Sequence, residues 1–234
     1  MRRIIFLLFC VLCLSFSLNA IASPIVPETK PLEKEEHDYL CQAIALTVLK
    51  EKPNIKSFNS FDIRSDGALL LGSDDPQKMV IAYTQAGTFW FGFSFRCSGD
   101  FCVKWDDNGH VILYLVRSDA LLILDHTGNV LSITGSIANN VENAEYVRKE
   151  MQPQKRTING MTYCMKKEDG VLGVFSSAYS ELVRIDEAGR EQPLIDLRSE
   201  HRFSVIVFFV FLIVFLALLT LIIFQNVKKR NITF

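Results

Sequence analysis

The stretch VILYLVRSDALLILDHTGNVLSI, Val111 to Ile133, decides the fold class of this chain. Its three apolar runs are separated by RSD at residues 117–119 and by HTGN at residues 126–129. Short runs of aliphatic residues bounded by turn-forming residues are typical of β-strands. The stretch therefore predicts an antiparallel meander of three strands.

A second stretch, TFWFGFSF at residues 88–95, alternates between phenylalanine and other residues. Because successive side chains of a strand point to opposite faces, the four phenylalanines share one face, and Trp90 lies on the other with Thr88, Gly92 and Ser94. This pattern predicts a strand whose phenylalanine face belongs to the core.

Apolar runs end repeatedly in a four-residue turn that closes on glycine. The turns are RSDG (64–67), TQAG (84–87), DDNG (106–109), DHTG (125–128) and DEAG (186–189). Asp or Thr caps such a turn with its side chain, and glycine supplies the positive φ. The intervals between the glycines are 20, 22, 19 and 61 residues, so a hairpin of about 20 residues is half of a four-stranded unit of roughly 40.

The segments ILDHTGNVLSI (123–133) and VRIDEAGREQPLID (183–196) resemble the hairpin repeats of β-propellers. They also resemble uncharacterised extracytoplasmic, membrane-anchored proteins of Gram-positive bacteria that carry such hairpins. The resemblance covers Phe58 to Asp196 and implies no activity. A closed propeller needs at least about four blades of four strands, and this chain has room for about three. We therefore expect an open sheet or partial propeller-like blades.

Two segments have the period of helices. HDYLCQAIALTVLKEK, His37 to Lys52, places apolar residues on one face and is stopped by Pro53, and NNVENAEYVRKEM, Asn139 to Met151, has a weaker apolar stripe. The expected fold class is thus mainly β, an antiparallel hairpin meander with one or two packed helices.

The N-terminal residues MRRIIFLLFCVLCLSFSLNAIA, 1–22, have the order of a secretory signal peptide cleaved after Ala22. An uncleaved anchor and a lipoprotein signal are the alternatives, but the apolar run is short for an anchor and no small residue stands before Cys10 or Cys13. The proline-rich, charged residues 23–36 are expected to form a linker.

Near the other end, the 22 residues Phe203 to Phe224 contain no charge, glycine or proline. As a helix they would be long enough to cross a bilayer. Lys228, Lys229 and Arg230 follow, so the positive-inside rule places the tail, residues 225–234, in the cytoplasm. The sequence thus predicts a single-pass plasma-membrane protein, with residues 37–202 as one domain outside the cell.

The predicted extracytoplasmic part carries 20 basic against 26 acidic residues. This negative balance argues against a nucleic acid or an anionic lipid as partner. The expected partners are the membrane, through the single span, and a protein or carbohydrate on the outer face.

No familiar catalytic motif occurs, so we expect no cofactor and assign no catalytic residue. The four histidines, at positions 37, 110, 126 and 201, lack ligand spacing. The acidic doublets Asp74-Asp75 and Asp106-Asp107 could offer oxygens to calcium, but turn chemistry explains both, so no metal site is expected.

Trp90 and Trp105 are the candidate interaction surface, as a platform for a sugar or a peptide. Alternatively, Trp90 is covered by the helix at residues 37–52 or by the segment after Asn139. Cover is the favoured expectation, because a bare sheet face invites aggregation.

After removal of the signal four cysteines remain, Cys41, Cys97, Cys102 and Cys164, outside the reducing cytosol. If RCSGDFC, residues 96–102, forms a hairpin with Gly99-Asp100 as its two-residue turn, Cys97 and Cys102 face one another and can bridge. Cys41 would then pair with Cys164. A three-residue loop, Ser98 to Asp100, would instead point Cys97 and Cys102 to opposite faces, where they cannot bridge.

The leading functional hypothesis is a membrane-anchored interaction or scaffolding module. A cell-surface hydrolase whose carboxylates meet only in the fold, and a ligand-sensing domain, are the alternatives.

Overall fold

The computed structural model describes residues 29–136, 141–167 and 179–232. For residues 136, 141–143, 200–202, 204–205 and 221–232 it describes the backbone only. The predicted signal peptide, residues 1–22, lies outside the described residues. The described part is mainly β and contains three antiparallel sheets, which confirms the expected fold class at this level.

Each sheet contains a meander of four consecutive strands. The first sheet comprises β3 (Ser60–Ile63), β4 (Leu69–Ser73), β5 (Met79–Tyr83) and β6 (Phe89–Ser94), with β2 (Thr47–Val48) beside β6. The second comprises β7 (Phe101–Trp105), β8 (Val111–Leu115), β9 (Ala120–Leu124) and β10 (Val130–Ser136), with β1 (Thr29–Pro31) beside β10. The third comprises β11 (Lys155–Ile158), β12 (Met161–Lys166), β13 (Glu181–Ile185) and β14 (Glu191–Asp196). The meander predicted over Val111–Ile133 is confirmed.

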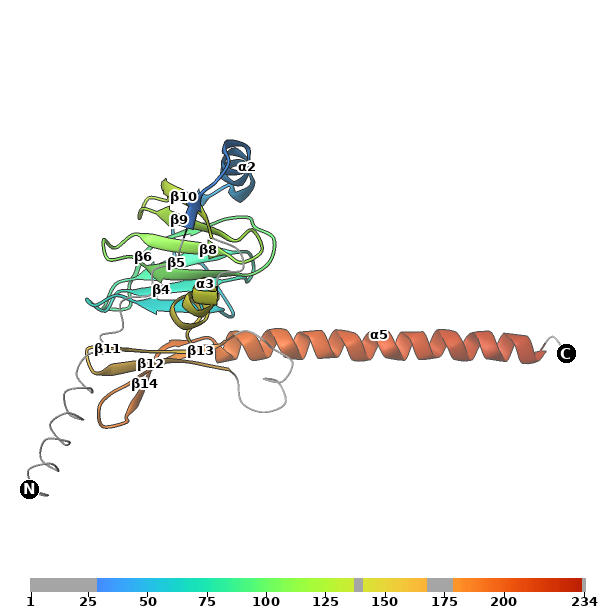
Figure 1. Cartoon of the computed structure of the whole chain (residues 1–234). Coiled ribbons are helices and arrows are strands. Elements are labelled where there is room, and N and C mark those ends of the chain that lie inside the picture. Colours follow the sequence, from blue (N-terminus) through green and yellow to red (C-terminus); the bar gives the residue numbers. More distant parts are fainter. Residues whose placement is uncertain (1–28, 137–140, 168–178, 233–234) are drawn as a thin grey trace, which may run out of the picture.

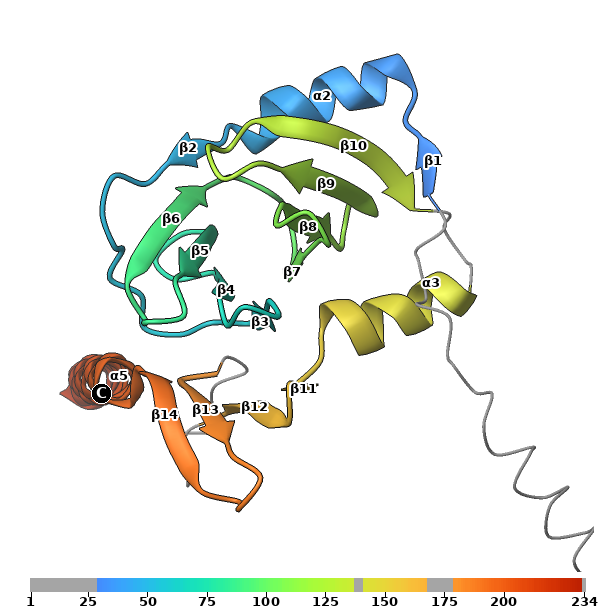
Figure 2. The same cartoon turned by 90° about the vertical axis from the view of Figure 1, so that its left-hand side faces the viewer.

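The first sheet is the middle layer of the molecule (Figure 2). Alternate residues of its strands point to two different cores, as the two-residue period of a strand requires. Leu70 and Val80 pack with Phe101 and Leu122 of the second sheet. Leu71, Met79 and Ile81 pack on the other side with Met165 and Leu182 of the third sheet.

A helical segment covers the outer face of the second sheet. It consists of α3 (Val141–Tyr146), followed by the π-helical turn η1 (Val147–Met151). Over these described residues it agrees with the helix predicted from Asn139 to Met151, whose first two residues lie outside the described part. Tyr146 and Met151 are buried there against Cys102 and Tyr114. The second sheet is therefore covered on both faces, like the first.

The first strands of the three meanders, β3, β7 and β11, lie near one another, and a buried carboxylate connects them. Asp62 of β3 accepts hydrogen bonds from the backbone N–H of Trp105 at the end of β7 (2.7 Å) and of Ile63 (2.9 Å). Its other close partner is Arg156 of β11, at 2.8 Å from Nε to Oδ1. A single side chain of the first sheet thus binds both other sheets.

Helix α2 (Lys34–Ile44) connects β1 to β2, and hence the edge of the second sheet to the edge of the first (Figure 2). Its buried residues Leu40 and Ile44 join the core between those two sheets. The predicted boundaries are wrong here. The chain leaves the helix at Ala45, in the left-handed region, and Thr47 and Val48 pair with β6, so the helix cannot reach Lys52.

The predicted linker, residues 23–36, is also wrong over its described part. Thr29 to Pro31 pair with β10 as a strand, and α2 begins at Lys34. Pairing with a sheet edge satisfies the backbone of a segment whose sequence has no strand period.

The last helix, α5, spans Arg198–Ile232 and follows β14 after one residue. Its first residue is tied to the third sheet, since the Arg198 guanidinium lies 2.6 Å from the carboxylate of Asp196 and 3.5 Å from that of Glu181. The helix then extends away from the sheets (Figure 1). Among the residues whose side chains are described, no helix offers a stretch long and apolar enough to cross a membrane.

Candidate functional site

The glycine turns gather at one end of the molecule. Within each meander the first and third connections lie at the same end of the sheet. Contacts between sheets align these ends, because Asn159 of the β11–β12 turn donates a hydrogen bond to the carbonyl of Ser65 (3.0 Å), and Gly109 of the β7–β8 turn abuts Arg64. We call this end, formed by the turns at residues 64–67, 84–87, 106–109, 125–128, 159–160 and 186–189, the turn face.

Aspartate side chains hold three of these turns in the same way. Oδ1 of Asp106 accepts hydrogen bonds from the backbone N–H groups two and four residues later, and Asp125 and Asp186 do the same. Hydrogen bonding to Thr127 and Asn129 lowers the pKa of Asp125 to about 2. The sequence prediction of side-chain-capped turns that close on a positive-φ glycine is confirmed at all five turns that it named.

An aromatic and cationic cluster lies on the turn face. The Arg64 guanidinium lies 5.3 Å from the ring centroid of Trp90 and 5.1 Å from that of Trp105, and Asp66 binds it through two hydrogen bonds. A Cβ atom at Gly109 would lie 2.6 Å from Nη1 of Arg64, so a larger residue would displace the guanidinium, and the φ of +80° itself favours glycine. The cluster is therefore held from the β3–β4 and β7–β8 turns together.

The two tryptophans differ in exposure. Trp90 is 42% exposed, whereas Trp105 is buried at 5%. The favoured expectation is that the helix at residues 37–52 or the segment after Asn139 covers Trp90. In the described part of the chain the ring stays half-exposed, and its ring and cation contacts are with Phe91, Trp105 and Arg64. Of the two tryptophans predicted to form the interaction surface, only Trp90 is exposed. Trp105 and Arg64 pack against its ring.

A charged group of residues lies beneath this surface, where the three sheets meet. Glu150 of η1 accepts a 2.7 Å hydrogen bond from Lys104, and the Arg156 side chain donates to the Glu150 carbonyl. Burial raises the pKa of Asp62, while Arg156 and the N–H of Trp105 act in the opposite direction. These groups are mutually paired, and Asp62 is buried while Lys104, Glu150 and Arg156 are partly exposed. They fit a structural role, which fixes the sheets under the turn face.

The predicted hairpin at RCSGDFC is wrong. Strand β6 pairs with β5 and β2, and β7 pairs with β8, so residues 95–100 cross from the first sheet to the second. Cys97 packs near the core between these sheets, whereas Cys102 is buried on the opposite face of β7. Because β6 and β7 do not pair, residues 96–102 form neither the hairpin with a two-residue loop nor the one with a three-residue loop.

All four cysteines of the expected mature chain are free thiols in the structure. Neither Cys97 with Cys102 nor Cys41 with Cys164 forms a disulfide. Cys41 is exposed on α2, and Cys164 is partly buried on β12 of the third sheet. Burial raises the pKa of Cys102 to about 11, so this thiol stays protonated at neutral pH.

The acidic doublets stand apart from one another. Asp106 is committed to its turn and to His110, whose Nδ1 lies 2.8 Å from Oδ2, while Asp74 pairs with Lys78 at 3.2 Å. Within the described ranges, no three His, Cys, Asp or Glu side chains lie close enough to hold a metal ion together. Asp74 does line a cavity of about 220 Å³ with Asp100, at the end opposite the turn face.

Two functional side chains were missed by sequence reasoning. Arg64 was read only as part of a turn, and Asp62 was not singled out. A signal for Asp62 exists, because a carboxylate stands between Phe61 and Ile63 in a strand whose neighbours are apolar on both sides. Arg64 carries no comparable signal, since its aromatic partners are distant in sequence.

No protein-family model matches this chain, and no curated protein matches it either. Eight chains of solved structures are similar to it. One is the crystal structure of a protein of unknown function from Bacteroides caccae, with 14% sequence identity and a TM-score of 0.27. The similarity covers 58% of this chain and 44% of that one, so the chain spans less than half of its length.

Proposed function

We propose that the chain is a single-pass, membrane-anchored extracytoplasmic interaction module. Its anchor is the apolar stretch Phe203–Phe224, and the basic residues after it lie in the cytoplasm. The sequence of this stretch supports the proposal, as does the exposure of Phe203 and of most apolar side chains between Ile206 and Leu219. An apolar surface of this extent on a soluble protein is costly unless lipid or a partner covers it.

The observation that carries the proposal is the position of the turn face relative to α5. In Figure 1 the tips of the β11–β12 and β13–β14 hairpins point away from α5, which leaves the sheets at their opposite end. An anchor at Phe203–Phe224 would therefore hold the turn face outward, away from the bilayer. Half-exposed Trp90 would then be available to a partner in the extracytoplasmic space.

We also infer that the three meanders are propeller-like blades. They span residues 60–94, 101–136 and 155–196, and their first strands lie innermost, connected by Asp62. The segment α3–η1 lies between the second and third meanders, where a ring would need another blade. The turn face corresponds, in this interpretation, to one end of an incomplete ring.

The orientation can be tested through Cys41, the exposed thiol on α2. A membrane-impermeant maleimide should label Cys41 on intact cells, and the protein should stay with the membranes after an alkaline carbonate wash. Cys41→Ser serves as the control, since Cys102 is buried and Cys97 and Cys164 are partly buried. Labelling only after lysis, or release by carbonate, would contradict the proposal.

The interaction face can be tested by cross-linking in native membranes, with Trp90→Ala compared with Tyr39→Ala. Tyr39 is a more exposed aromatic residue on α2, away from the turn face. We expect Trp90→Ala to lower recovery of a cross-linked partner about tenfold, because exposed tryptophans frequently dominate binding energy. Equal recovery with both variants would remove Trp90 from the proposed interface.

One observation favours a second candidate, the surface hydrolase. Asp74 and Asp100 line the same cavity, as a pair of carboxylates for acid and base catalysis would. Lys78 already pairs with Asp74, which leaves Asp100 as the group open to a substrate. We therefore rank this function below the interaction module.

A further inference from the structure

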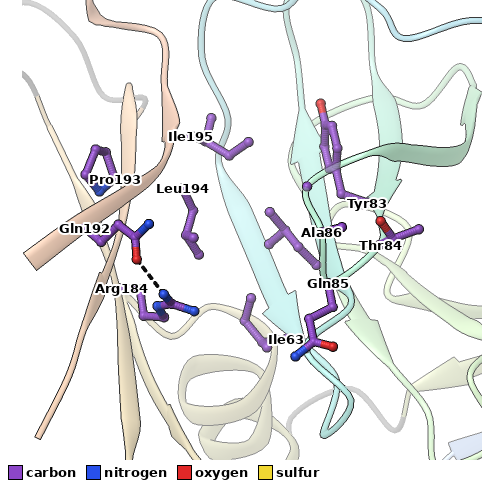
Figure 3. Close-up of a pocket in the computed structure, with 13 residues that line it drawn as sticks. Ile63, Tyr83, Thr84, Gln85, Ala86, Arg184, Gln192, Pro193, Leu194 and Ile195 are labelled. Carbon is purple, nitrogen blue, oxygen red and sulfur yellow. Dashed lines mark hydrogen bonds between the residues drawn. The ribbon is translucent and has the colours of Figure 1, made fainter.

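A cavity of about 300 Å³ opens between the first and third sheets at the turn face. Figure 3 shows Arg184 and Gln192 of the third sheet on one side and Thr84, Gln85 and Ala86 of the β5–β6 turn on the other. A second hollow of about 240 Å³ shares Tyr83, Leu194 and Ile195 with it. The two cavities are therefore neighbours along β14, and the second reaches Leu197 beside the start of α5.

Arg184 is a cation at the border of the apolar core between the first and third sheets. It lies two residues after Leu182, which is fully buried against the first sheet, and both side chains share that face of β13. Its cross-strand neighbours are Tyr163 and Gln192. A charge on the inner face of a sheet is costly and needs a partner of opposite charge or water.

Within the described part of the chain, no carboxylate forms a direct ion pair with Arg184, although Asp186 lies near enough to feel its charge. Nη2 donates a 2.5 Å hydrogen bond to Oε1 of Gln192, which is neutral. Asp186, whose pKa is lowered partly by the charge of Arg184, binds Arg190 at 2.7 Å instead. The guanidinium thus retains donors that can bind an anion in the cavity.

The other lining residues add an apolar wall and polar groups. Ile63, Leu69 and Ile195 line the cavity with aliphatic surface. Gln85 packs against Gly67, where a Cβ atom would lie 2.8 Å from its Cγ. Burial raises the pKa of Tyr83 to about 12, so its phenol remains protonated and adds no negative charge to the cavity.

We propose that this cavity binds a small ligand that carries one carboxylate and an apolar body. The carboxylate pairs with the Arg184 guanidinium, whose planar donors match it, and the apolar body lies against Ile63 and Leu69. A free acid and the C-terminal residue of a peptide share this chemistry. The inference does not depend on α5 entering a membrane, so either proposal can fail without the other.

The experiment is a calorimetric titration of the full chain in detergent micelles with N-acetyl-leucine and with its uncharged amide. We expect the acid to bind and the amide to bind at least about tenfold more weakly. Arg184→Gln should weaken binding of the acid about tenfold, whereas Arg190→Gln, which removes an exposed arginine outside the cavity, should change it less than about twofold. Arg184→Lys, which keeps the charge, should retain part of the affinity.

The peptide N-acetyl-Gly-Gly-Leu separates the two sources of carboxylate. Binding as tight as that of N-acetyl-leucine indicates a peptide C-terminus, and weaker binding indicates a free acid. Absence of acid binding at roughly 10 mM, or equal affinities of wild type and Arg184→Gln, would overturn the proposal. In that case Arg184 has a structural role, since its hydrogen bond to Gln192 joins β13 to β14. Ala86→Trp, which fills the cavity from an exposed turn, provides a second variant should Arg184→Gln not fold.

Discussion

The first and third sheets have the same four-stranded meander but different surroundings. In β3, β4 and β5 every residue is buried, whereas in β14 all residues but Ile195 are exposed. The difference follows from position, because the first sheet lies between the other two and the third has only one covered face. The first sheet, in the middle, therefore contributes mainly to stability. The third sheet, at the side, can keep Arg184 and a cavity at its inner face, and its last strand leads into α5.

The largest effect that this comparison predicts is that of Asp62→Ala. The substitution leaves Arg156 buried without its carboxylate and removes the acceptor for the N–H of Trp105. We expect the free energy of unfolding to fall by about 3 to 5 kcal/mol, measured by chemical denaturation of the full chain. Asp66→Ala, at an exposed ion pair four residues away, should cost less than about 1 kcal/mol. A similar loss for both variants would mean that Asp62 does not connect the sheets energetically.

A leucine pair tests the two sheets directly. Leu71 of β4 is fully buried, and Leu194 of β14 is 37% exposed. We expect Leu71→Ala to lower the free energy of unfolding by about 2 to 5 kcal/mol, through lost burial and the void that it leaves. Leu194→Ala should cost less than about 1 kcal/mol in the same denaturation experiment. Comparable losses would show that the third sheet contributes to stability as much as the first.

Much of the local fold could be predicted from the sequence, because strands and turns depend on neighbouring residues. The meander over Val111–Ile133 and the five glycine turns are examples. The alternation in residues 88–95 is confirmed for Phe91, Phe93 and Phe95, which lie in one core. Phe89 packs in the other core, because a register shift between Ala82 and Tyr83 turns its side chain to the opposite face.

The pairing of distant segments could not be predicted. Gly99 takes a positive φ, as a hairpin turn would, yet its segment crosses between sheets. A hairpin turn and a crossing between two sheets give the same local signal in the sequence. Only long-range packing decides which strand becomes the neighbour. The two tryptophans of the candidate site could be named from the sequence, but Arg64 and Arg184 could not. Arg64 meets Trp90 and Trp105 only through the fold, and Arg184 lines a cavity with residues about 100 positions earlier.

The smallest predicted effect concerns two equivalent turns. One, at Asp106, is packed against its neighbours, and the other, at Asp186, belongs to the third sheet. Asp106 and Asp186 each accept two backbone N–H bonds and pair with the side chain four residues later, His110 and Arg190 respectively. Asp106 is the more enclosed, with its side chain 15% exposed. We expect Asp106→Ala to cost about 1 to 2 kcal/mol at neutral pH, and Asp186→Ala to cost less.

The pH dependence of these two variants follows from the direction of the pKa shifts. Burial opposes ionisation of Asp106, but its hydrogen bonds to the backbone and side chain of His110 prevail and lower its pKa below 3.8. The backbone N–H of Arg190 is the main cause of the lowered pKa of Asp186. A carboxyl group whose pKa is lower in the folded state than in the unfolded state stabilises the fold. This contribution is complete at a pH above the unfolded-state pKa and is lost as the pH falls through the folded-state pKa. The difference in unfolding midpoint between wild type and Asp106→Ala should therefore shrink as the pH falls below about 4. A difference that grew as the pH fell from about 4 to about 2 would show that the carboxylate of Asp106 does not hold its turn.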